Sequence, residues 1–168
     1  MTHFSDYFTP LYAIERVVSK HQTAILFENN NGKWSVIQHL YHCWMVEKGV
    51  LAYIKLKTQD PTSLVSVSIK TRLTFMFFFI ALRWNVLKVN APEIVQDFPD
   101  KMSIEDLMEK WTMTRKDADS FFINFPKNLA KKGIFRHAFI GRLNKKLTQK
   151  FIEQHLRHHL KLCDLQPN

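Results

Sequence analysis

Histidines are the residues of this 168-residue chain whose spacing most directly predicts chemistry. His155 and His159 are four residues apart in "FIEQHLRHHLKLC", and His39 and His42 are three apart in "SVIQHLYHCWMVEKG". Side chains four residues apart on a helix project from adjacent turns of one face, so two such imidazoles can chelate one metal ion. Burying an imidazole costs free energy unless a metal ion or a hydrogen bond replaces water. The spacing therefore predicts either a metal site or hydrogen-bonded core histidines.

The predicted last helix carries its histidines on its apolar side. At 100° per residue its polar side chains gather on one arc, which we expect to face solvent: Lys150, Glu153, Gln154, Arg157 and Lys161. His155 and His159 lie near the middle of the opposite, apolar arc, and His158 lies at its edge. The pair at four-residue spacing is thus expected to face the protein interior, with His158 closer to solvent.

An earlier predicted helix supplies a further inward imidazole. On its helical wheel His42 lies opposite Lys48 and Lys55, and His39 lies about 60° from His42. One imidazole from this helix and two from the last helix make a three-nitrogen site, the ligand number of catalytic metal sites that keep an open position. Imidazole nitrogens suit zinc, nickel, iron(II) or copper, and ligand type alone does not choose among them.

Other uses of these residue types fit less well. A di-iron carboxylate bundle requires a glutamate three residues before each histidine, and the candidate ligands have none. Neighbouring residues on a helix diverge by about 100°, so Cys43 points away from His42 and drops out of the site. Cys163, four residues after His159, fits either a fourth ligand or a small apolar core residue.

Hydrophobic periodicity and capping residues predict an all-α protein. The expected helices cover about 7–27, with Pro10 in the first turn, then 35–57, 63–88, 103–125 and 144–163. Ser35 and Ser103 are expected N-caps, with Asp106 as the acid of a capping box. The only alternating stretch, "SLVSVSIK", is assigned to a helix. Helices of these lengths predict an antiparallel bundle that forms a single domain over residues 1–168.

Composition narrows the function classes. The chain has only 4 glycines and no G-x-G-x-x-G, P-loop or G-x-S-x-G motif, which argues against Rossmann, P-loop and α/β-hydrolase proteins. The two cysteines predict reduced thiols and a cytoplasmic protein, and the N-terminal residues do not resemble a signal peptide. The apolar run from Leu73 to Leu82 is too short to span a bilayer and is expected to be a buried helix segment.

The net charge of +9 is concentrated toward the C-terminus. From Pro126 onward the chain has ten Lys or Arg residues and only Glu153 and Asp164 as acids. A basic end of this kind attracts nucleic acid, an anionic membrane or an anionic substrate, or it is simply a solvated face.

Two segments, taken together, resemble the DinB-like superfamily. In that family a Trp-Ser pair is followed by a Glu or Gln and then by a histidine eight residues after the Trp. The segment "KWSVIQHLYHCWMVE" has these residues at Trp34, Ser35, Gln38 and His42. The family ends with an H-P-x-x-G-x-L stretch and a helix that carries H-x-x-x-H, which "FRHAFIGRLNKKLTQKFIEQHLRHHLKL" resembles.

The second segment departs from the family pattern in two places. Ala138 stands where a proline is usual after His137, and the segment after His159 lacks a commonly present glutamine. Neither departure removes a ligand. The segment "VNAPEIVQDFPDKMSIEDLMEKW" resembles the subgroup that carries an insertion after the second helix, so the resemblance covers most of the chain from Trp34 to Cys163.

The resemblance implies a four-helix bundle with an inserted extra helix and one divalent metal, bound by His42, His155 and His159. It selects His42 over His39 and His159 over His158, and leaves His39 a packing residue or a neighbour of the ligands. Family members are often dimers, and some transfer a low-molecular-weight thiol such as bacillithiol or mycothiol. We therefore expect zinc or nickel, with iron as a further candidate, a small-molecule substrate and a homodimer, with a low-molecular-weight thiol as a candidate cosubstrate.

The sequence supports three functions. The first is a metal-dependent enzyme of transferase or hydrolase type, whose open metal position activates a thiol or water. Glu47 or Tyr53 would then assist protons or serve only structure, and Arg136 and Arg142 would receive an anionic substrate. The second is a non-enzymatic bundle with a structural or vestigial metal site. The third is a basic, nucleic-acid-associated stress protein, although no helix-turn-helix or RNA-binding signature is evident.

Overall fold

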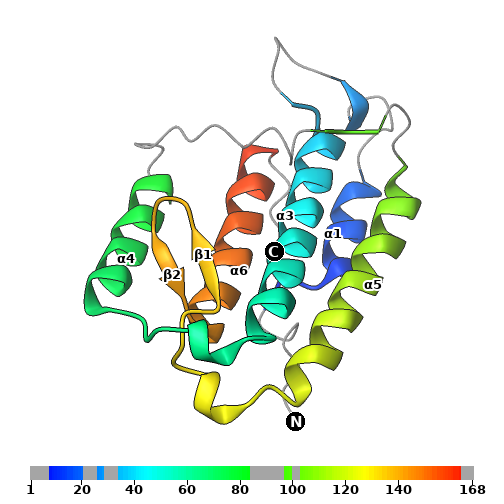
Figure 1. Ribbon diagram of the computed structural model, residues 1–168. Coiled ribbons are helices and arrows are strands. Elements are labelled where there is room, and N and C mark those ends of the chain that lie inside the picture. The colour runs from blue at the N-terminus through cyan, green and yellow to red at the C-terminus, as the bar shows by residue number, and fades with distance from the viewer. Residues whose placement is uncertain (1–7, 21–25, 29–33, 84–96, 100–102, 164–168) are drawn as a thin grey trace.

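The computed structural model describes residues 8–20, 26–28, 34–83, 97–99 and 103–163 of the chain (Figure 1). Its helices are α1 (Leu11–Val18), α3 (Val36–Thr58), α4 (Ile69–Arg83), α5 (Ile104–Ile123) and α6 (Lys145–Leu162). Two short 3₁₀ turns, η2 (Pro61–Ser63) and η4 (Lys127–Leu129), and a hairpin of β1 (Phe135–His137) and β2 (Gly141–Leu143) complete the described elements.

Four of these helices form the bundle. Helix α3 packs on both α5 and α6, α1 packs on α5, and α4 packs against α6 and β2 outside the four-helix group (Figure 1). The two-stranded hairpin is antiparallel and pairs Phe135 with Leu143 and His137 with Gly141. This arrangement confirms the predicted all-α bundle with an extra helix. Among the described helices, none is both long and apolar enough to span a membrane.

The predicted helix starts at Ser35 and Ser103 are confirmed. The hydroxyl of Ser35 accepts from the backbone N–H of Gln38, and the Gln38 amide oxygen accepts from the N–H of Ser35 at 2.8 Å, which forms a capping box. Ser103 likewise accepts from the N–H of Asp106. The Ser103 hydroxyl also donates to Glu105, and the Asp106 carboxylate accepts from Lys110 rather than closing the predicted capping box.

Several predicted helix boundaries were also wrong. The first helix begins only after Pro10, which serves as its N-cap, and α1 ends at Val18. Residues 64–68 are not helical, because Val65 accepts from the N–H of Gly133 and Ser66 forms a bridge with Lys132. The alternation in "SLVSVSIK" was therefore a strand signal, whose partner lies more than sixty residues away. Most of the predicted turn at 28–33 and loop at 90–103 lies outside the described residues.

Helix α4 is more exposed than its apolar sequence predicted. Phe75 is buried and Phe78 and Phe79 pack on the core. Side chains on another face are between 45% and 76% exposed: Ile69, Leu73, Met76, Phe77 and Ile80. The prediction of a buried helix was wrong for this face, because α4 lies outside the four-helix group and contacts α6 and β2 from one side only.

The hairpin, which the sequence did not predict, turns His137 inward. Its ring lies 4.8 Å from Phe151 and 5.3 Å from Phe78, measured between centroids. Its Nδ1 atom accepts from the backbone N–H groups of Phe139 and Ile140. Burial lowers the pKa of His137 to about 4. The neutral ring therefore closes the tight turn between β1 and β2.

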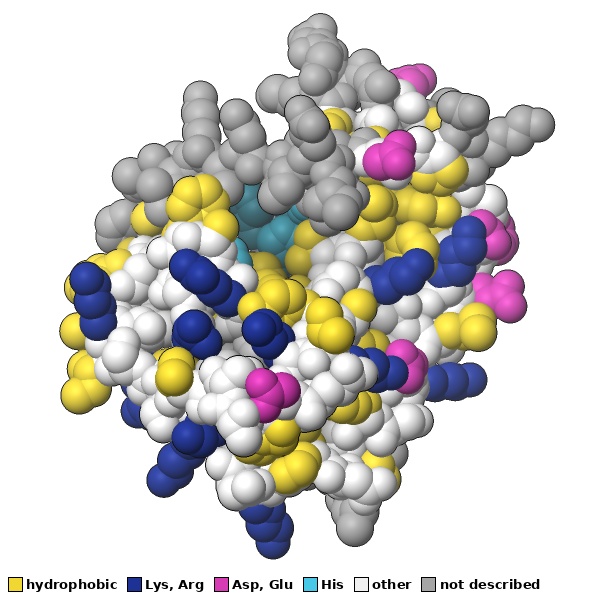
Figure 2. Space-filling view, viewed as in Figure 1, with side chains coloured by type: hydrophobic (Ala, Val, Ile, Leu, Met, Phe, Trp, Pro, Cys, Tyr) yellow, Lys and Arg dark blue, Asp and Glu magenta, His cyan; other side chains and the backbone are white. Residues whose placement is uncertain are grey.

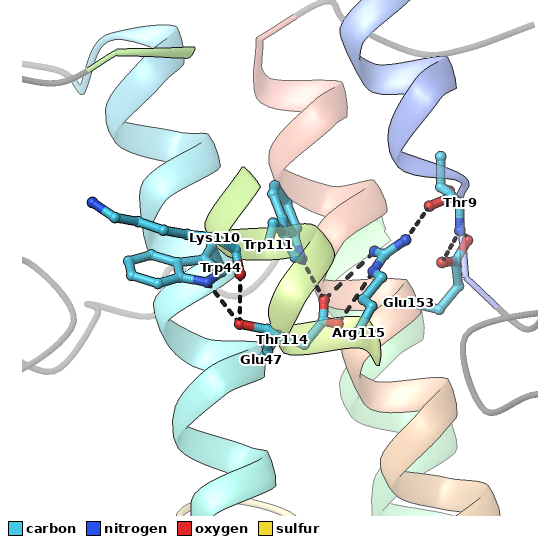
Figure 3. A network of polar contacts seen from close by, with 8 residues as sticks. All are labelled: Thr9, Trp44, Glu47, Lys110, Trp111, Thr114, Arg115 and Glu153. Atoms are coloured by element: carbon cyan, nitrogen blue, oxygen red, sulfur yellow. Dashed lines mark hydrogen bonds and ion pairs between the residues drawn. The ribbon is translucent and has the colours of Figure 1, made fainter. Parts of the chain in front are cut away.

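A buried polar network links the helices of the bundle (Figure 3). Glu47 on α3 accepts from the indole N–H of Trp111 at 2.7 Å and from the guanidinium of Arg115 at 3.2 Å, both on α5. Arg115 also donates to the Thr9 carbonyl at 2.7 Å. Glu153 on α6 accepts from the N–H and hydroxyl of Thr9, at 2.8 and 3.0 Å. The network thus ties the segment before α1 to α3, α5 and α6.

Glu153 is buried, although the helical wheel predicted it on the solvent face of the last helix. That prediction was wrong, because only 8% of Glu153 is exposed. The wheel could not show that residues before α1 cover this part of α6. On α3, Glu47 lies between two apolar clusters, one that includes Cys43 and one that includes Val50. The network is therefore a polar layer inside the core.

Replacing Glu47 with alanine should strongly destabilise the protein. The change leaves the Arg115 charge and the Trp111 N–H buried without their acceptor, which costs about 3–5 kcal/mol when one partner of a buried pair is removed. Urea denaturation of the metal-free protein measures the loss. Asp117→Ala is the matched control, because it removes an exposed ion pair to Lys55 between the same two helices; about 1 kcal/mol or less is expected. Equal losses would contradict a stabilising polar layer.

Stability of the metal-free protein should fall on acidification, in part through His137. The unfolded chain takes up a proton near the ordinary pKa of 6.5, whereas the folded protein does so only near 4. Acid therefore favours the unfolded state across this window. His137→Asn keeps an acceptor near the Nδ1 position but does not titrate, so its free energy of unfolding should drop less between about pH 7 and about pH 4.5. An unchanged pH dependence would contradict this role.

Candidate metal centre

The three predicted ligands, His42 from α3 and His155 and His159 from α6, come together. Each offers one ligand atom, and these atoms all lie within 4.8 Å of one another. The Nε2 atoms of His42 and His155 are 3.2 Å apart. With metal–nitrogen bonds of about 2.0–2.1 Å, two ligands of a tetrahedral zinc site have nitrogens about 3.3–3.4 Å apart. The three imidazole donors, and the spacing of His42 and His155, therefore fit a small divalent ion.

The local sequence explains why these side chains meet. The capping box at Ser35 fixes the first turn of α3 and places His42 in its second turn. Asn144 caps α6 by accepting from the N–H of Leu147, and the four-residue spacing then puts His155 and His159 on adjacent turns. Packing of α3 against α6 brings the two helices' imidazoles together. Ser35 and Gln38 thus contribute to the site by fixing where α3 begins, which sets the position of His42.

Burial keeps the cluster neutral. His42 and His159 are 3% and 8% exposed, and His155 is partly buried. Burial, and then repulsion from neighbouring imidazoles, lowers the pKa of His155 and of His159 well below the ordinary value. Neutral imidazole is the form that binds a metal ion. In the described part of the chain no carboxylate belongs to this ligand group, so the site adds no negative charge.

Aromatic side chains border the cluster. The Trp34 ring lies 5.0 Å from His42 and 6.4 Å from His159, where it is stacked, and Phe98 packs on the edge of Trp34. Phe151 lies 5.7 Å from His155. Figure 2 shows histidine surface at the floor of a hollow, with apolar side chains along part of its edge. The site thus combines imidazole nitrogens with aromatic and apolar neighbours.

The other histidines in the described part of the chain occupy distinct positions. His39 lies beside His159, with their Nδ1 atoms 2.8 Å apart, and burial and His42 lower the pKa of His39 to about 4. His158 lies next to His159 with ring centroids 5.4 Å apart, and burial lowers its pKa. His137 contacts Phe151, which in turn contacts His155. Sequence reasoning left all three roles open.

Glu47 and Tyr53, the two residues considered for proton transfer, make structural contacts. Glu47 is 3% exposed and is held by Arg115 and Trp111. Tyr53 packs its ring against the edge of Phe135. The polar network that holds Glu47 was missed from the sequence, because its members are spread over the chain from Thr9 to Glu153.

The two hairpin arginines lie on the outer face of the hairpin. Arg136 and Arg142 are exposed and directly opposite each other, on the face of the hairpin away from the inward-pointing Phe135 and His137. The hairpin was not predicted from the sequence, and its alternation decides which side chains face inward. Reception of an anionic substrate by these arginines stays a prediction.

The cysteines also lie apart from the ligand group. Cys43 is buried in the apolar cluster with Leu40 and Trp111, and burial raises the pKa of its thiol well above the usual value. This agrees with the prediction that Cys43 points away from the site. Cys163 is the C-cap residue of α6, and the group of three ligand atoms does not include it.

The comparisons with known proteins identify a family. The family profile of the DinB superfamily matches residues 12–163, which include both Trp34 and the histidine pair of α6. No curated protein and no solved structure gives a match. Because the profile match covers nearly the whole chain and both predicted motifs, the chain belongs to the DinB superfamily.

Proposed function

We propose that this protein is a metal-dependent enzyme, which binds one divalent transition metal ion through His42, His155 and His159. The observation that carries the proposal is the convergence of three buried or partly buried imidazoles, with their ligand atoms within 4.8 Å of one another. Zinc or nickel is the ion we expect, with iron(II) next. A bound ion of this kind supplies a Lewis acid that activates a thiol or a water as nucleophile.

The neutral ligand set favours thiol chemistry. Three imidazoles leave the charge of a divalent ion uncompensated, and no carboxylate joins the described ligand group. An anionic ligand such as a thiolate is then attracted to the remaining position. We therefore propose transfer of a low-molecular-weight thiol to a small electrophile, with hydrolysis of a small molecule as the second reaction type. The rings of Trp34, which contacts His42, and of Phe98, which contacts Trp34, suit an electrophile with an apolar body.

We further propose that the protein acts in the cytoplasm. Low-molecular-weight thiols are kept reduced there, and Cys43 and Cys163 do not form a disulfide with each other. Their state agrees with a reducing compartment and with the thiol cosubstrate proposed above.

The purified protein should bind about one equivalent of zinc or nickel. His159→Ala removes one of three ligands and should weaken binding by a factor of at least about 100. Elemental analysis and titration with a competing chelator measure this. His158→Ala is the control, since it removes the adjacent imidazole of the same helix and should leave binding intact. Less than about a tenth of an equivalent, with no binding on titration at neutral pH, would contradict the metal site.

Two further readouts use the same preparations. Cobalt(II) should quench the fluorescence of Trp34, because its ring lies against His42 and His159; Trp34→Phe should abolish most of this quenching. Conjugation of a reduced thiol to a chromogenic electrophile, and hydrolysis of a chromogenic ester, should be lost in His159→Ala. Metal binding without either reaction, together with a lower melting temperature in His42→Ala, would instead show a structural metal site.

We also propose a homodimer, which the family resemblance implies. Exposed apolar side chains of the described chain gather on α4, the face such a contact would bury. Phe77→Glu should therefore shift the molar mass measured by light scattering from dimer to monomer. Met113→Glu is the control, since Met113 is a similarly exposed apolar residue on α5. A monomeric wild-type protein, or a Phe77→Glu variant that remains dimeric, would contradict this interface.

A further inference from the structure

We infer that His39 is the hydrogen-bond partner that fixes His159 in the tautomer presenting Nε2 to the metal, and that it is not a fourth ligand. The inference rests on the proposed metal site. It assigns His39 a positioning role, because His39 would act on the ion only through His159.

The contact between the two rings carries the argument. Their Nδ1 atoms are 2.8 Å apart, a hydrogen-bond distance, so one atom holds a proton and the other a lone pair. If His159 binds the ion through Nε2, its proton is on Nδ1 and it donates to His39. His39 then carries its own proton on Nε2.

The distance between the two Nδ1 atoms argues against both of them binding the metal. If both Nδ1 atoms were ligands, they would have to lie about 3.3–3.4 Å apart in a tetrahedral site with ordinary metal–nitrogen bonds. The observed separation of 2.8 Å is shorter than that, whereas the 3.2 Å between the Nε2 atoms of His42 and His155 is close to it. The His39–His159 distance therefore fits a hydrogen bond, and the His42–His155 distance fits two ligands of one metal ion.

The surroundings hold His39 in place for this role. It lies one turn before His42 on α3, and the edge of Trp34 contacts its ring at 5.4 Å between centroids. Histidine ligands usually donate their second N–H to a carboxylate, a carbonyl or water, and such partners orient the ring. A neutral imidazole does the same without adding negative charge, which preserves the full charge of the ion.

Zinc affinity of two substitutions at this position tests the inference. His39→Leu removes the acceptor and should weaken zinc binding by about 10–100-fold, measured against a competing chelator. His39→Asn places its side-chain oxygen near the former Nδ1 position and should stay within about threefold of wild type. His158→Leu, which removes a neighbouring imidazole, should also stay within about threefold. If His39→Leu does not fold without metal, His39→Phe replaces it as the ring-shaped variant without an acceptor.

Long-range proton–nitrogen NMR of the zinc-loaded protein provides a readout that packing alone would not change. In wild type, His159 should show a metal-bound Nε2 and a protonated Nδ1 that exchanges slowly. His39→Leu should retain the metal-bound Nε2 but lose the slow exchange of the Nδ1 proton.

The failures are distinguishable. A metal-bound nitrogen on His39, wild-type affinity in His39→Leu, or an equal loss in His39→Asn and His39→Leu would overturn this inference while leaving the three-histidine site in place. Absence of zinc binding by the wild-type protein would overturn the proposed function itself.

Discussion

The contact between α3 and α6 is the constraint on which the candidate site depends. These helices are separated by about a hundred residues in the sequence, and their packing brings His42 against His155 and His159. The site therefore exists only in the folded protein, and any ion bound there stabilises the native state. The cost of burying neutral imidazoles is offset by the hydrogen bond between His39 and His159 and, in our proposal, by the metal bound to the three ligands.

The polar layer holds the same helices together at a different level of the bundle. Glu47 is five residues after His42 on α3, and Glu153 is two residues before His155 on α6. The layer thus lies close to the ligands on both helices and connects them through Arg115 and Thr9. Buried ion pairs contribute little net stability, but they penalise alternative packings that leave a charge unpaired. Such a layer suits a protein whose ligands come from two helices that must keep one register.

Features that depend on residues near one another in the sequence were predicted correctly. The start of α3 followed from Ser35 as N-cap, and the pairing of His155 with His159 followed from helical spacing. The family resemblance added the choice of His42 over His39, which the helical wheel alone left open. These residues are close in sequence to the features that determine their orientation.

What escaped prediction depends on contacts between distant segments. Residues 64–68 became extended because Gly133 and Lys132 pair with them, and Glu153 became buried because Thr9 covers it. The hairpin decided that Arg136 faces outward and His137 inward. No window of the sequence contains both members of these pairs, so periodicity could not reveal them.

X-ray absorption spectroscopy of the zinc-loaded protein, in buffer free of added thiols, can identify and count the ligands of the metal. We predict a first coordination shell with three imidazole nitrogens at about 2.0–2.1 Å and one further light atom. A sulfur scatterer at about 2.3 Å would instead place a cysteine in the site, and a fit that requires four imidazoles would add His39 to the ligands. Either result would contradict an open, three-histidine metal centre.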